Sequence, residues 1–403
     1  MIFGLPFHTA RFFRPTLLEV FGFTNTQLGD LFAVYGITAM LSYFPGGAIA
    51  DRFSARFLLT VSLVATGCGG LYMATIPGPR QMAVLYGFWG ITTIFLFWGA
   101  LIRATREWGG QSSQGTAFGI LEAGRGIAAA VFAVFSVAVL AWYLPADATL
   151  ATDAERLAGM RAIILVYSAA AFAAGALAWL VIPDPGAVSA TPRNPFANMA
   201  LVLRRPIVWA QAGIIVCAYC AYKGVDYFSL YAVQVLGMDE VRGARLVAYG
   251  AYVRPVAAIA AGLIADRFDA TRSIGAVFVV LAVVYAALSV SMPGETSLYI
   301  IYLNLLISLF GVFALRGIYF ALLQETRTPP HITGAAVGMI SLVGFTPEIF
   351  FAPIAGRILD ATPGAGGHFN LFMLLAAVAA LGVVFVAWLI RLERNNSGSE
   401  PVS

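Results

Sequence analysis

The chain has 403 residues, of which 60% are hydrophobic and 11% are charged, with a formal net charge of +4 and a mean hydropathy of +0.84. Because a soluble domain carries about 25% charged residues, this composition excludes an ordinary soluble protein and indicates a protein of the bilayer. The positive charge comes almost entirely from arginines that flank apolar runs instead of clustering, which excludes the usual nucleic-acid reading of a basic protein.

Twelve apolar stretches are long enough to cross a bilayer, which takes about 20 residues in a helix. They fall at approximately 2–21, 28–50, 57–76, 82–102, 115–142, 161–182, 207–236, 244–265, 273–292, 297–322, 333–359 and 368–390. The stretch 183–206 is polar and rich in proline, which is typical of a linker. We therefore expect an all-α membrane protein with two six-helix bundles, 1–182 and 207–392, a cytoplasmic linker at 183–206 and a tail at 393–403.

One motif occurs twice, 215 residues apart, each time between two apolar runs. The equivalent residues are Gly47, Asp51, Arg52 and Arg56 in the first copy and Gly262, Asp266, Arg267 and Arg272 in the second. The same offset carried backwards makes Arg11 the repeat mate of Asp226. A repeat at half the chain length in a hydrophobic protein predicts two structurally equivalent halves.

The repeat also predicts that the first helix is truncated. Its mate begins near Ile207, and subtracting 215 places the equivalent start about eight residues before Met1. We expect a translation start upstream of Met1, and a clipped first helix is the alternative.

The distribution of arginine predicts the orientation in the membrane. With both termini in the cytoplasm, the inner loops and tail hold twelve arginines and the outer loops hold five. This asymmetry agrees with the positive-inside rule and predicts a multi-pass protein of a bacterial inner membrane.

Twelve spans, a central cytoplasmic loop and the motif Gly47-x3-Asp51-Arg52-x3-Arg56 with its second copy resemble the major facilitator superfamily. The resemblance covers the whole chain. The runs Glu122-Ala-Gly-Arg125-Gly and Thr333-Gly-Ala-Ala with Pro347 are also similar to a poorly characterised branch of bacterial inner-membrane facilitators. The family pattern usually has a second glycine where Ser54 and Asp269 stand, which leaves the tight turn at these two places in doubt.

The resemblance implies a conformational latch at the cytoplasmic face. In the family, the aspartate equivalent to Asp51 or Asp266 faces the N-terminus of a helix from the other half, where backbone N–H groups carry partial positive charge. Arginines of the motif would add ion pairs, with Glu107 and Glu325 as candidate acids. The alternative is that these arginines merely fix the topology. The expected latch residues are Gly47, Asp51, Arg52, Arg56, Gly262, Asp266, Arg267 and Arg272.

Charged residues within the spans are candidates for a substrate site. A charge near the bilayer centre costs at least about 2.5–3.5 kcal/mol, so it usually faces a cavity or a partner. The cations are Arg11, Arg125, Lys223, Arg254 and Arg316, and the acids are Glu122, Asp226 and Glu348. Five cations against three acids predict an anionic substrate, because a guanidinium binds a carboxylate, sulfonate or phosphate in a two-pronged fork. Purely structural pairing within the protein remains the alternative.

Acids and aromatic residues in the spans complete the expected site. A buried carboxyl group beside a mobile cation can change protonation, so Glu348, Asp226 and Glu122 are candidates for proton coupling, with Glu348 preferred. Tyr222 and Tyr227 are expected to line the substrate cavity, although most aromatic residues of a membrane bundle serve in packing.

These observations predict a secondary transporter for a small organic anion, working by alternating access and coupled to protons. A drug or metabolite efflux antiporter is the alternative, although Gly124-Arg125-Gly126 stands where efflux members carry a glycine–proline signature. A membrane enzyme or receptor is disfavoured, since no metal, nucleotide or catalytic motif is present in the sequence. We expect a monomer in the lipid bilayer with no cofactor, no metal and no nucleic-acid partner, and we interpret Cys217-Ala-Tyr-Cys220 as buried thiols.

Overall fold

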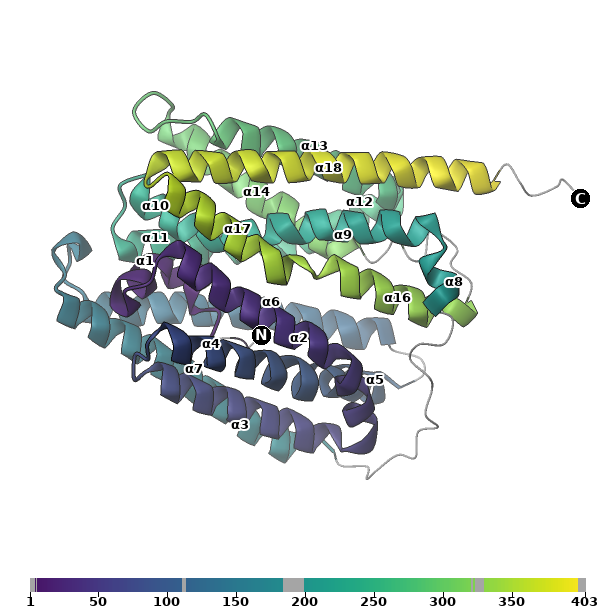
Figure 1. Ribbon diagram of the computed structural model, residues 1–403, viewed down its shortest axis with the longest axis horizontal. Coiled ribbons are helices and arrows are strands. Elements are labelled where there is room, and N and C mark those ends of the chain that lie inside the picture. Colours follow the sequence, from purple (N-terminus) through teal and green to yellow (C-terminus); the bar gives the residue numbers. More distant parts are fainter. Residues whose placement is uncertain are drawn as a thin grey trace, which may run out of the picture. The chain divides into compact units, whose positions relative to one another are not determined.

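The computed structural model describes residue 4 and residues 6–110, 114–183, 199–319, 322 and 330–397. Within these ranges the regular structure is helical, and the remaining backbone forms turns with one isolated bridge between Pro293 and Thr296. Figure 1 shows the helices as long coils coloured along the chain.

The helices of the first half of the chain are α1 (Thr9–Phe21), α2 (Asn25–Arg52), α3 (Ala55–Met73), α4 (Pro79–Gly90), the π-helix η2 (Ile91–Trp98), α5 (Gly99–Gly109), α6 (Gln114–Tyr143), the short η3 (Ala148–Leu150) and α7 (Asp153–Val181). The helices that follow are α8 (Met199–Leu203), α9 (Pro206–Gly224), the short η4 (Val225–Tyr227), α10 (Phe228–Gln234), α11 (Glu240–Gly250), α12 (Val253–Phe268), α13 (Ala270–Leu288), α14 (Leu298–Ile318), α16 (Pro330–Gly344), α17 (Pro347–Ala361) and α18 (Ala365–Ser397).

The described helices confirm the expectation of a helical membrane protein. Ten helical stretches among the described residues are long and apolar enough to cross a bilayer. Together with α1 and α2 they occupy the twelve spans expected from the sequence. Four ends differ from the expectation by seven residues or more. α1 begins at Thr9 instead of near residue 2, and α5 ends at Gly109 instead of near residue 102. α7 begins at Asp153 instead of near residue 161, and α18 continues to Ser397 into the expected tail.

The early start of α7 has a sequence signal that apolar patterning overlooks. Thr152 accepts a hydrogen bond from the backbone N–H of Glu155, and the Glu155 side chain accepts one from the backbone N–H of Thr152. This reciprocal capping box starts the helix among polar residues. In the preceding loop, hydrogen bonds from the side chain and the backbone N–H of Thr149 lower the pKa of the Asp147 carboxyl below its ordinary value.

Prolines break or bend three of the expected spans. A proline lacks the N–H of a helical hydrogen bond, and its ring clashes with the carbonyl four residues earlier. Ala251 is the residue four positions before Pro255, and α11 ends just before it, at Gly250. Likewise α16 ends at Gly344, shortly before Pro347. In α1, Pro15 lies beside a kink at Phe13, whose φ and ψ are −116° and 30°.

Packing divides the chain into two compact units, which are described separately. Unit 1 comprises Met1–Pro192, Asp226–Tyr252 and Glu348–Asp360, and unit 2 comprises Arg193–Val225, Val253–Pro347 and Ala361–Ser403. Unit 1 therefore contains α1 to α7 together with α10, α11 and nearly all of α17. Segments from the second half of the sequence thus pack on helices of the first half within this unit.

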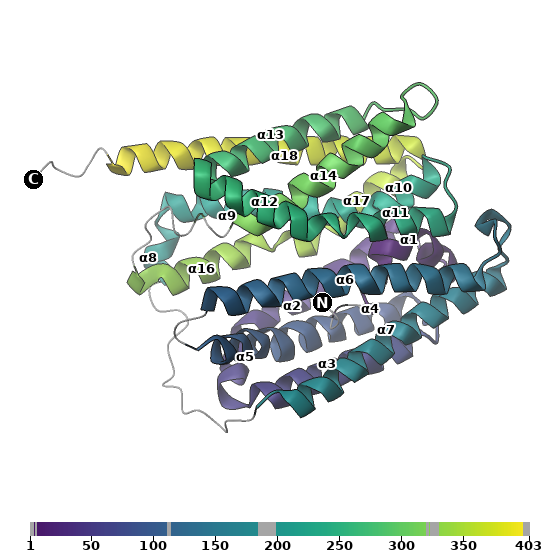
Figure 2. The same cartoon turned by 180° about the vertical axis from the view of Figure 1, so that it is seen from behind.

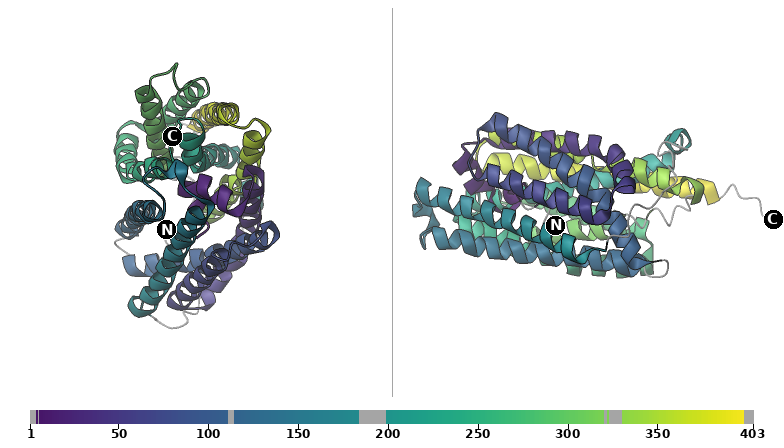
Figure 3. Two further views of the ribbon diagram at one scale, coloured as in Figure 1. Left: turned by 90° about the vertical axis from the view of Figure 1, so that its left-hand side faces the viewer. Right: turned by 90° about the horizontal axis from the view of Figure 1, so that it is seen from below.

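Close helix packing in unit 1 depends on glycine. A Cβ added at Gly70 of α3 would lie 2.0 Å from the Ser168 hydroxyl oxygen of α7, and one added at Gly90 would lie 2.0 Å from the Thr38 hydroxyl oxygen of α2. Small residues of this kind let helix backbones approach each other in a membrane. The long helices of the first half accordingly run side by side, as Figure 3 shows in purple and blue.

Unit 2 is built in the same way from α9, α12, α13, α14, α16 and α18. Figure 2 shows α13 lying along α18, where a Cβ on Gly382 would meet the ring of Phe278 at 2.7 Å. On the other side of α18, a Cβ on Gly213 of α9 would meet the ring of Phe385 at 2.5 Å. These contacts fix α9, which carries several of the expected site residues.

Candidate functional site

A buried ion pair joins the two halves of the sequence in unit 1. The Nε–H of Arg11 donates to the Asp226 carboxylate, and the two side chains are 9% and 6% exposed. Arg11 lies in α1, and Asp226 lies in the one-turn η4 where the expected seventh span changes from α9 to α10. The structure therefore brings together one predicted cation and one predicted acid.

The two members of this pair are equivalent positions of the repeat. Arg11 and Asp226 lie 215 residues apart, which is the offset of the two motif copies, and they contact each other directly. Equivalent positions of the two halves therefore carry opposite charges and form an ion pair within unit 1.

The proline in α1 adds a second contact beside this pair. Because Pro15 has no N–H, it cannot bond to the carbonyl of Arg11 four residues earlier. The hydroxyl of Ser229 in α10 donates to that carbonyl oxygen at 3.3 Å instead. The kink in α1 thus presents a backbone acceptor to a helix from the second half of the sequence.

Arg14 is a buried cation that the sequence analysis did not select. It is 1% exposed, and its guanidinium carbon lies 4.1 Å from the ring centroid of Tyr227. Its Nε–H donates to the Oδ1 of Asn25 at 3.1 Å. The signal in the sequence was its spacing of three from Arg11, which places both arginines on one side of α1.

A carboxylate of α17 holds the first residues of α2. Asp360 accepts hydrogen bonds from the backbone N–H groups of Asn25 and Thr26 at 3.2 and 2.7 Å, and from the Asn25 side chain at 3.2 Å. Nearby, Arg357 of α17 bonds to Asp30 of α2 at 2.8 Å, with both side chains more than half exposed. These contacts lie at the end of unit 1 where α1 ends and α2 begins, which we call the α1–α2 end.

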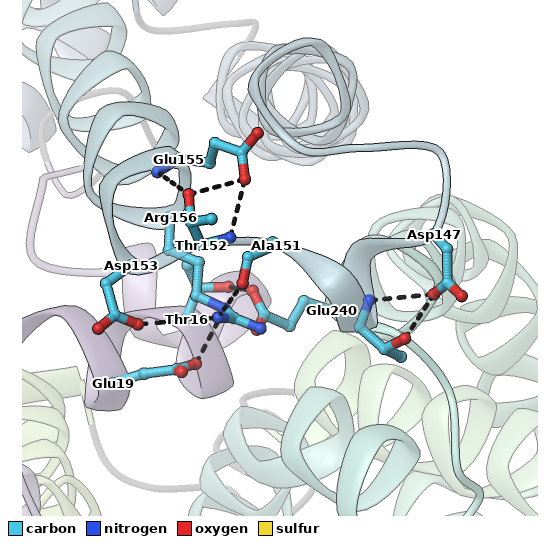
Figure 4. A network of polar contacts seen from close by, with 10 residues as sticks. Thr16, Glu19, Asp147, Ala151, Thr152, Asp153, Glu155, Arg156 and Glu240 are labelled. Atoms are coloured by element: carbon cyan, nitrogen blue, oxygen red, sulfur yellow. Dashed lines mark hydrogen bonds and ion pairs between the residues drawn. The ribbon is translucent and has the colours of Figure 1, made fainter.

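A second polar cluster ties α11 to α1 and α7 at the same end. Figure 4 shows Arg156 between Glu19 and Glu240, with its Nε 3.1 and 2.7 Å from their carboxylate oxygens. The other Glu240 oxygen accepts from the hydroxyl of Thr16 at 2.8 Å, and a terminal nitrogen of Arg156 donates to the carbonyl of Ala151 at 2.7 Å. Glu240 is 8% exposed, so the cluster compensates the cost of burying its charge.

Unit 2 holds a guanidinium stacked on tyrosines. The guanidinium carbon of Arg316 in α14 lies 4.0 Å from the ring centroid of Tyr222 and 5.6 Å from that of Tyr219, both in α9. The Tyr219 ring also packs on Phe345 at 5.2 Å. A cation–π contact orients the guanidinium without consuming its N–H donors. Lys223 follows in the last turn of α9 and is 2% exposed.

The remaining expected site residues are placed as follows. Arg125 of α6 is half-buried, with its guanidinium carbon 5.5 Å from the ring centroid of Trp98. Arg254 lies half-buried in the first turn of α12, and Glu348 lies half-buried in the first turn of α17. Tyr227 contacts Arg14 and donates to the Ala352 carbonyl at 3.3 Å. The side chain of Glu122 lies outside the described part of the structure.

The expected latch residues are described only in part, because the side chains of Asp51 and Asp266 also lie outside the described part. Arg56 donates to the Ile182 carbonyl at the end of α7 at 2.7 Å, whereas Arg52, Arg267 and Arg272 are exposed. Gly47 and Gly262 both have open space where a Cβ would lie. Glu325 lies outside the described residues.

An arginine outside the motif holds the end of α2. Arg103 of α5 donates to the carbonyls of Ala50 and Phe53 at 2.8 and 3.2 Å, and it pairs with Glu107 at 2.7 Å. Helix C-terminal carbonyls lack partners in their own helix and attract cations. Glu107 therefore contacts Arg103 rather than an arginine of the motif.

The two positions where the family pattern usually has a second glycine, Ser54 and Asp269, differ in backbone conformation. Ser54 has an ordinary φ of −64° and caps α3 by accepting from the Phe57 N–H. Asp269 has φ +83°, a conformation that favours glycine, and its side chain accepts from the Arg272 N–H. The second copy therefore adopts a backbone conformation that favours glycine, with a residue that also caps the following helix.

Comparison with known proteins decides the family. The sequence profile described as "Major Facilitator Superfamily" matches residues 1–352. The chain belongs to the major facilitator superfamily. It is thus a transporter and not an enzyme, as the sequence predicted.

Superfamily members of similar sequence include two inner membrane proteins of Escherichia coli (strain K12). YqcE is 29% identical over 92% of this chain and 87% of that protein, and YihN is 26% identical over 97% and 92%. A probable hexose phosphate transport protein of Chlamydia trachomatis is 30% identical over 31% of this chain and 27% of that protein.

Solved structures of superfamily transporters share the fold. A bacterial homolog of the human lysosomal transporter Spinster, in an inward-facing and occupied conformation, superposes with a TM-score of 0.73 at 15% identity, over 97% of this chain and 95% of that chain. The fold expected from the repeat and the twelve spans is therefore confirmed for this major facilitator.

Proposed function

We propose that the protein is a secondary transporter for a small organic anion, such as a sugar acid, carboxylate, sulfonate or phosphate ester. The observation that carries this proposal is Arg316, held 4.0 Å over the ring of Tyr222 in unit 2. A guanidinium oriented by a ring offers its planar N–H edge to an oxyanion in a two-pronged fork. In a superfamily transporter, the site of such recognition lies between the two halves near the middle of the membrane.

The sign of the charge inside the helices supports the same class of substrate. Arg14 adds a sixth cation to the five that the sequence selects, against three acids. A net positive field inside a low-dielectric bundle attracts anions and repels lipophilic cations. The alternative of a drug-efflux antiporter for cations therefore gains no support from these side chains.

The name of one relative agrees with this chemistry. The Chlamydia trachomatis protein that matches about a third of this chain is called a probable hexose phosphate transport protein. A hexose phosphate is a phosphate ester and falls within the proposed class. The match is too short to transfer the substrate, so the proposal names the class of anion.

We further propose that transport is coupled to protons through Glu348, with Asp226 and Glu122 as the other candidates. Asp226 is held in the ion pair with Arg11, whereas Glu348 stands directly after the break before Pro347. A carboxyl group at a helix break can change its surroundings when the two halves move. Both termini are proposed to lie in the cytoplasm of a bacterial cell, with the protein in the inner membrane as a monomer.

A ligand screen followed by substitution tests the proposal. Purified protein is screened by thermal shift against sugar phosphates, sugar acids, carboxylates and sulfonates, with uncharged sugars as the comparison. We expect an anion to raise the melting temperature. Stabilisation by uncharged sugars or by lipophilic cations, with no anion effective, would contradict the proposed class.

The arginines are then tested with the anion that binds. Arg316→Lys and Arg254→Lys each keep the charge but lose the planar fork, so we expect affinity to fall about tenfold or more. The matched control is Arg242→Lys, because the Arg242 side chain is 74% exposed and lies in α11, outside the proposed site. Affinity is measured by titration calorimetry. Unchanged affinity in either variant removes that arginine from the site.

A further inference from the structure

The contact between Asp360 and α2 is a helix cap supplied by a distant segment. The first N–H groups of a helix have no partner in their own helix and carry partial positive charge. Asp360, which is 335 residues from Asn25 in sequence, accepts from the N–H groups of Asn25 and Thr26, the first two residues of α2. Thr24 caps the same helix locally by accepting from the Gln27 N–H, so local and distant caps cover successive donors.

Behind this cap, α2 and α17 touch backbone to backbone. A Cβ added at Gly29 would lie 2.4 Å from the Ala352 carbonyl oxygen, and one added at Gly36 would lie 2.7 Å from the Glu348 carbonyl. A Cβ added at Gly356 would lie 2.4 Å from the Asn25 carbonyl oxygen. These three glycines set how closely the two helices approach, and therefore whether Asp360 reaches the start of α2.

A buried cation supports the cap through one amide. Asn25 donates its side-chain N–H to Asp360 and accepts at its Oδ1 from Arg14, so the amide lies between a guanidinium and a carboxylate. Arg14 in turn stacks on Tyr227 from the second half of the sequence. Hydrogen bonds to charged groups are stronger than those between neutral groups, so each partner reinforces the next.

We propose that Arg14, Asn25 and Asp360 form a latch, here called the cap latch, that holds the α1–α2 end closed and must break for that end to open. Alternating access moves the two halves of the sequence against each other. The cap latch joins residues 14 and 25 of the first half to residue 360 of the second, and its donors are the N-terminal N–H groups of α2. The proposal depends on membership of the superfamily and not on the chemistry of the substrate.

The exposed ion pair beside the cap latch provides a matched control. Arg357 and Asp30 also join α17 to α2, at 2.8 Å, but their side chains are 57% and 51% exposed. An exposed pair in water contributes little to stability, whereas loss of a helix cap shifts an equilibrium several-fold. The two contacts therefore differ in burial while connecting the same helices.

The experiment measures opening of the α1–α2 end directly and without substrate. Cys68, Cys217 and Cys220 are replaced by alanine, and spin labels are attached at Arg80→Cys and Glu295→Cys. Arg80 lies in the first turn of α4, and Glu295 lies in the turn between α13 and α14. Since successive spans alternate in direction, we expect both labels on the side of the membrane where α2 begins. Distance distributions are recorded by double electron–electron resonance in lipid nanodiscs.

We expect Asp360→Ala and Asn25→Asp to raise the ratio of long to short distances about three- to tenfold over the labelled parent. Asn25→Asp keeps the size and the acceptor for Arg14 but places a like charge against Asp360. Asp30→Asn is expected to leave the ratio unchanged.

The proposal is overturned if both test variants keep the parent distribution, or if Asp30→Asn shifts that distribution as much as they do. If Asp360→Ala does not fold, the nearly isosteric Asn25→Asp decides the outcome.

Discussion

At the scale of single residues, the Arg11–Asp226 pair shows how a repeat can carry complementary charges. Each residue stands at the equivalent position of its half, and the two side chains contact each other. A perfectly symmetric repeat would place like charges there and repel them. Divergence of the two halves at this one position converts a repulsion of two buried like charges into an ion pair.

A double-mutant cycle tests whether this pair joins the halves. Arg11→Ala or Asp226→Asn alone leaves one buried charge without its partner, and we expect each to destabilise the protein by about 3–5 kcal/mol. The double variant, Arg11→Ala with Asp226→Asn, removes both charges and should lose less stability than the sum of the two single losses. Stability is measured as the thermal unfolding midpoint in detergent for all variants.

The control for this cycle is Asp30→Asn, which removes the acid of an exposed pair whose Arg357 and Asp30 side chains are 57% and 51% exposed. We expect that change to cost less than about 1 kcal/mol. If the effects of the two single changes at Arg11 and Asp226 simply add in the double variant, the two residues do not interact.

At the scale of helices, breaks in the spans coincide with charges that we propose to bind the substrate, to carry the proton or to form the cap latch. Arg254 stands beside Pro255 at the start of α12, and Glu348 stands beside Pro347 at the start of α17. Arg11 and Arg14 lie on either side of the kink at Phe13. Interrupted helices expose backbone groups and helix ends at membrane depth, where superfamily transporters bind solutes and ions.

The glycine contact between α2 and α17 gives a prediction at this scale. Gly29→Ala places a methyl group against the backbone of Ala352, which a side-chain rotation cannot relieve. We therefore expect the α1–α2 end to open more often, with a larger fraction of long distances between labels at residues 80 and 295.

The matched control is Gly119→Ala in α6, where an added Cβ meets nothing within 4 Å. Alanine favours a helix over glycine by about 1 kcal/mol, so both substitutions gain the same helix propensity. They differ only in whether the new methyl group meets a neighbouring helix. Equal distance distributions for the two variants would show that the glycine contact does not control opening.

At the scale of the whole molecule, the features that could be predicted from the sequence are those that depend on the length of apolar runs and on the internal repeat. The twelve spans, the paired motif and the family follow from apolar run length and from the offset of 215 residues. The same offset aligned Arg11 with Asp226, but their direct contact was not predicted. The cap latch and the Glu240–Arg156 cluster could not be foreseen in this way. Their partners are 335 and 84 residues apart and share no offset with the repeat, so tertiary packing alone brings them together.

Coupling of transport to protons is a property of the whole cycle, and Glu348→Gln tests it. Glutamine has the shape of the protonated acid but cannot release a proton. Counterflow exchanges labelled for unlabelled substrate without net proton movement, so we expect it to persist in proteoliposomes of the variant. Uphill accumulation driven by a pH gradient should be lost, because the carrier can no longer return unprotonated.

The comparison variant is Asp226→Asn, which neutralises the acid that pairs with Arg11. If Glu348 carries the proton, accumulation is lost in Glu348→Gln whatever the outcome for Asp226→Asn. Loss of both counterflow and accumulation in Glu348→Gln would indicate a fault in binding or folding, which the thermal unfolding midpoint separates. Retention of both would assign the proton to Asp226 or Glu122, or to a transport cycle that moves no proton at all.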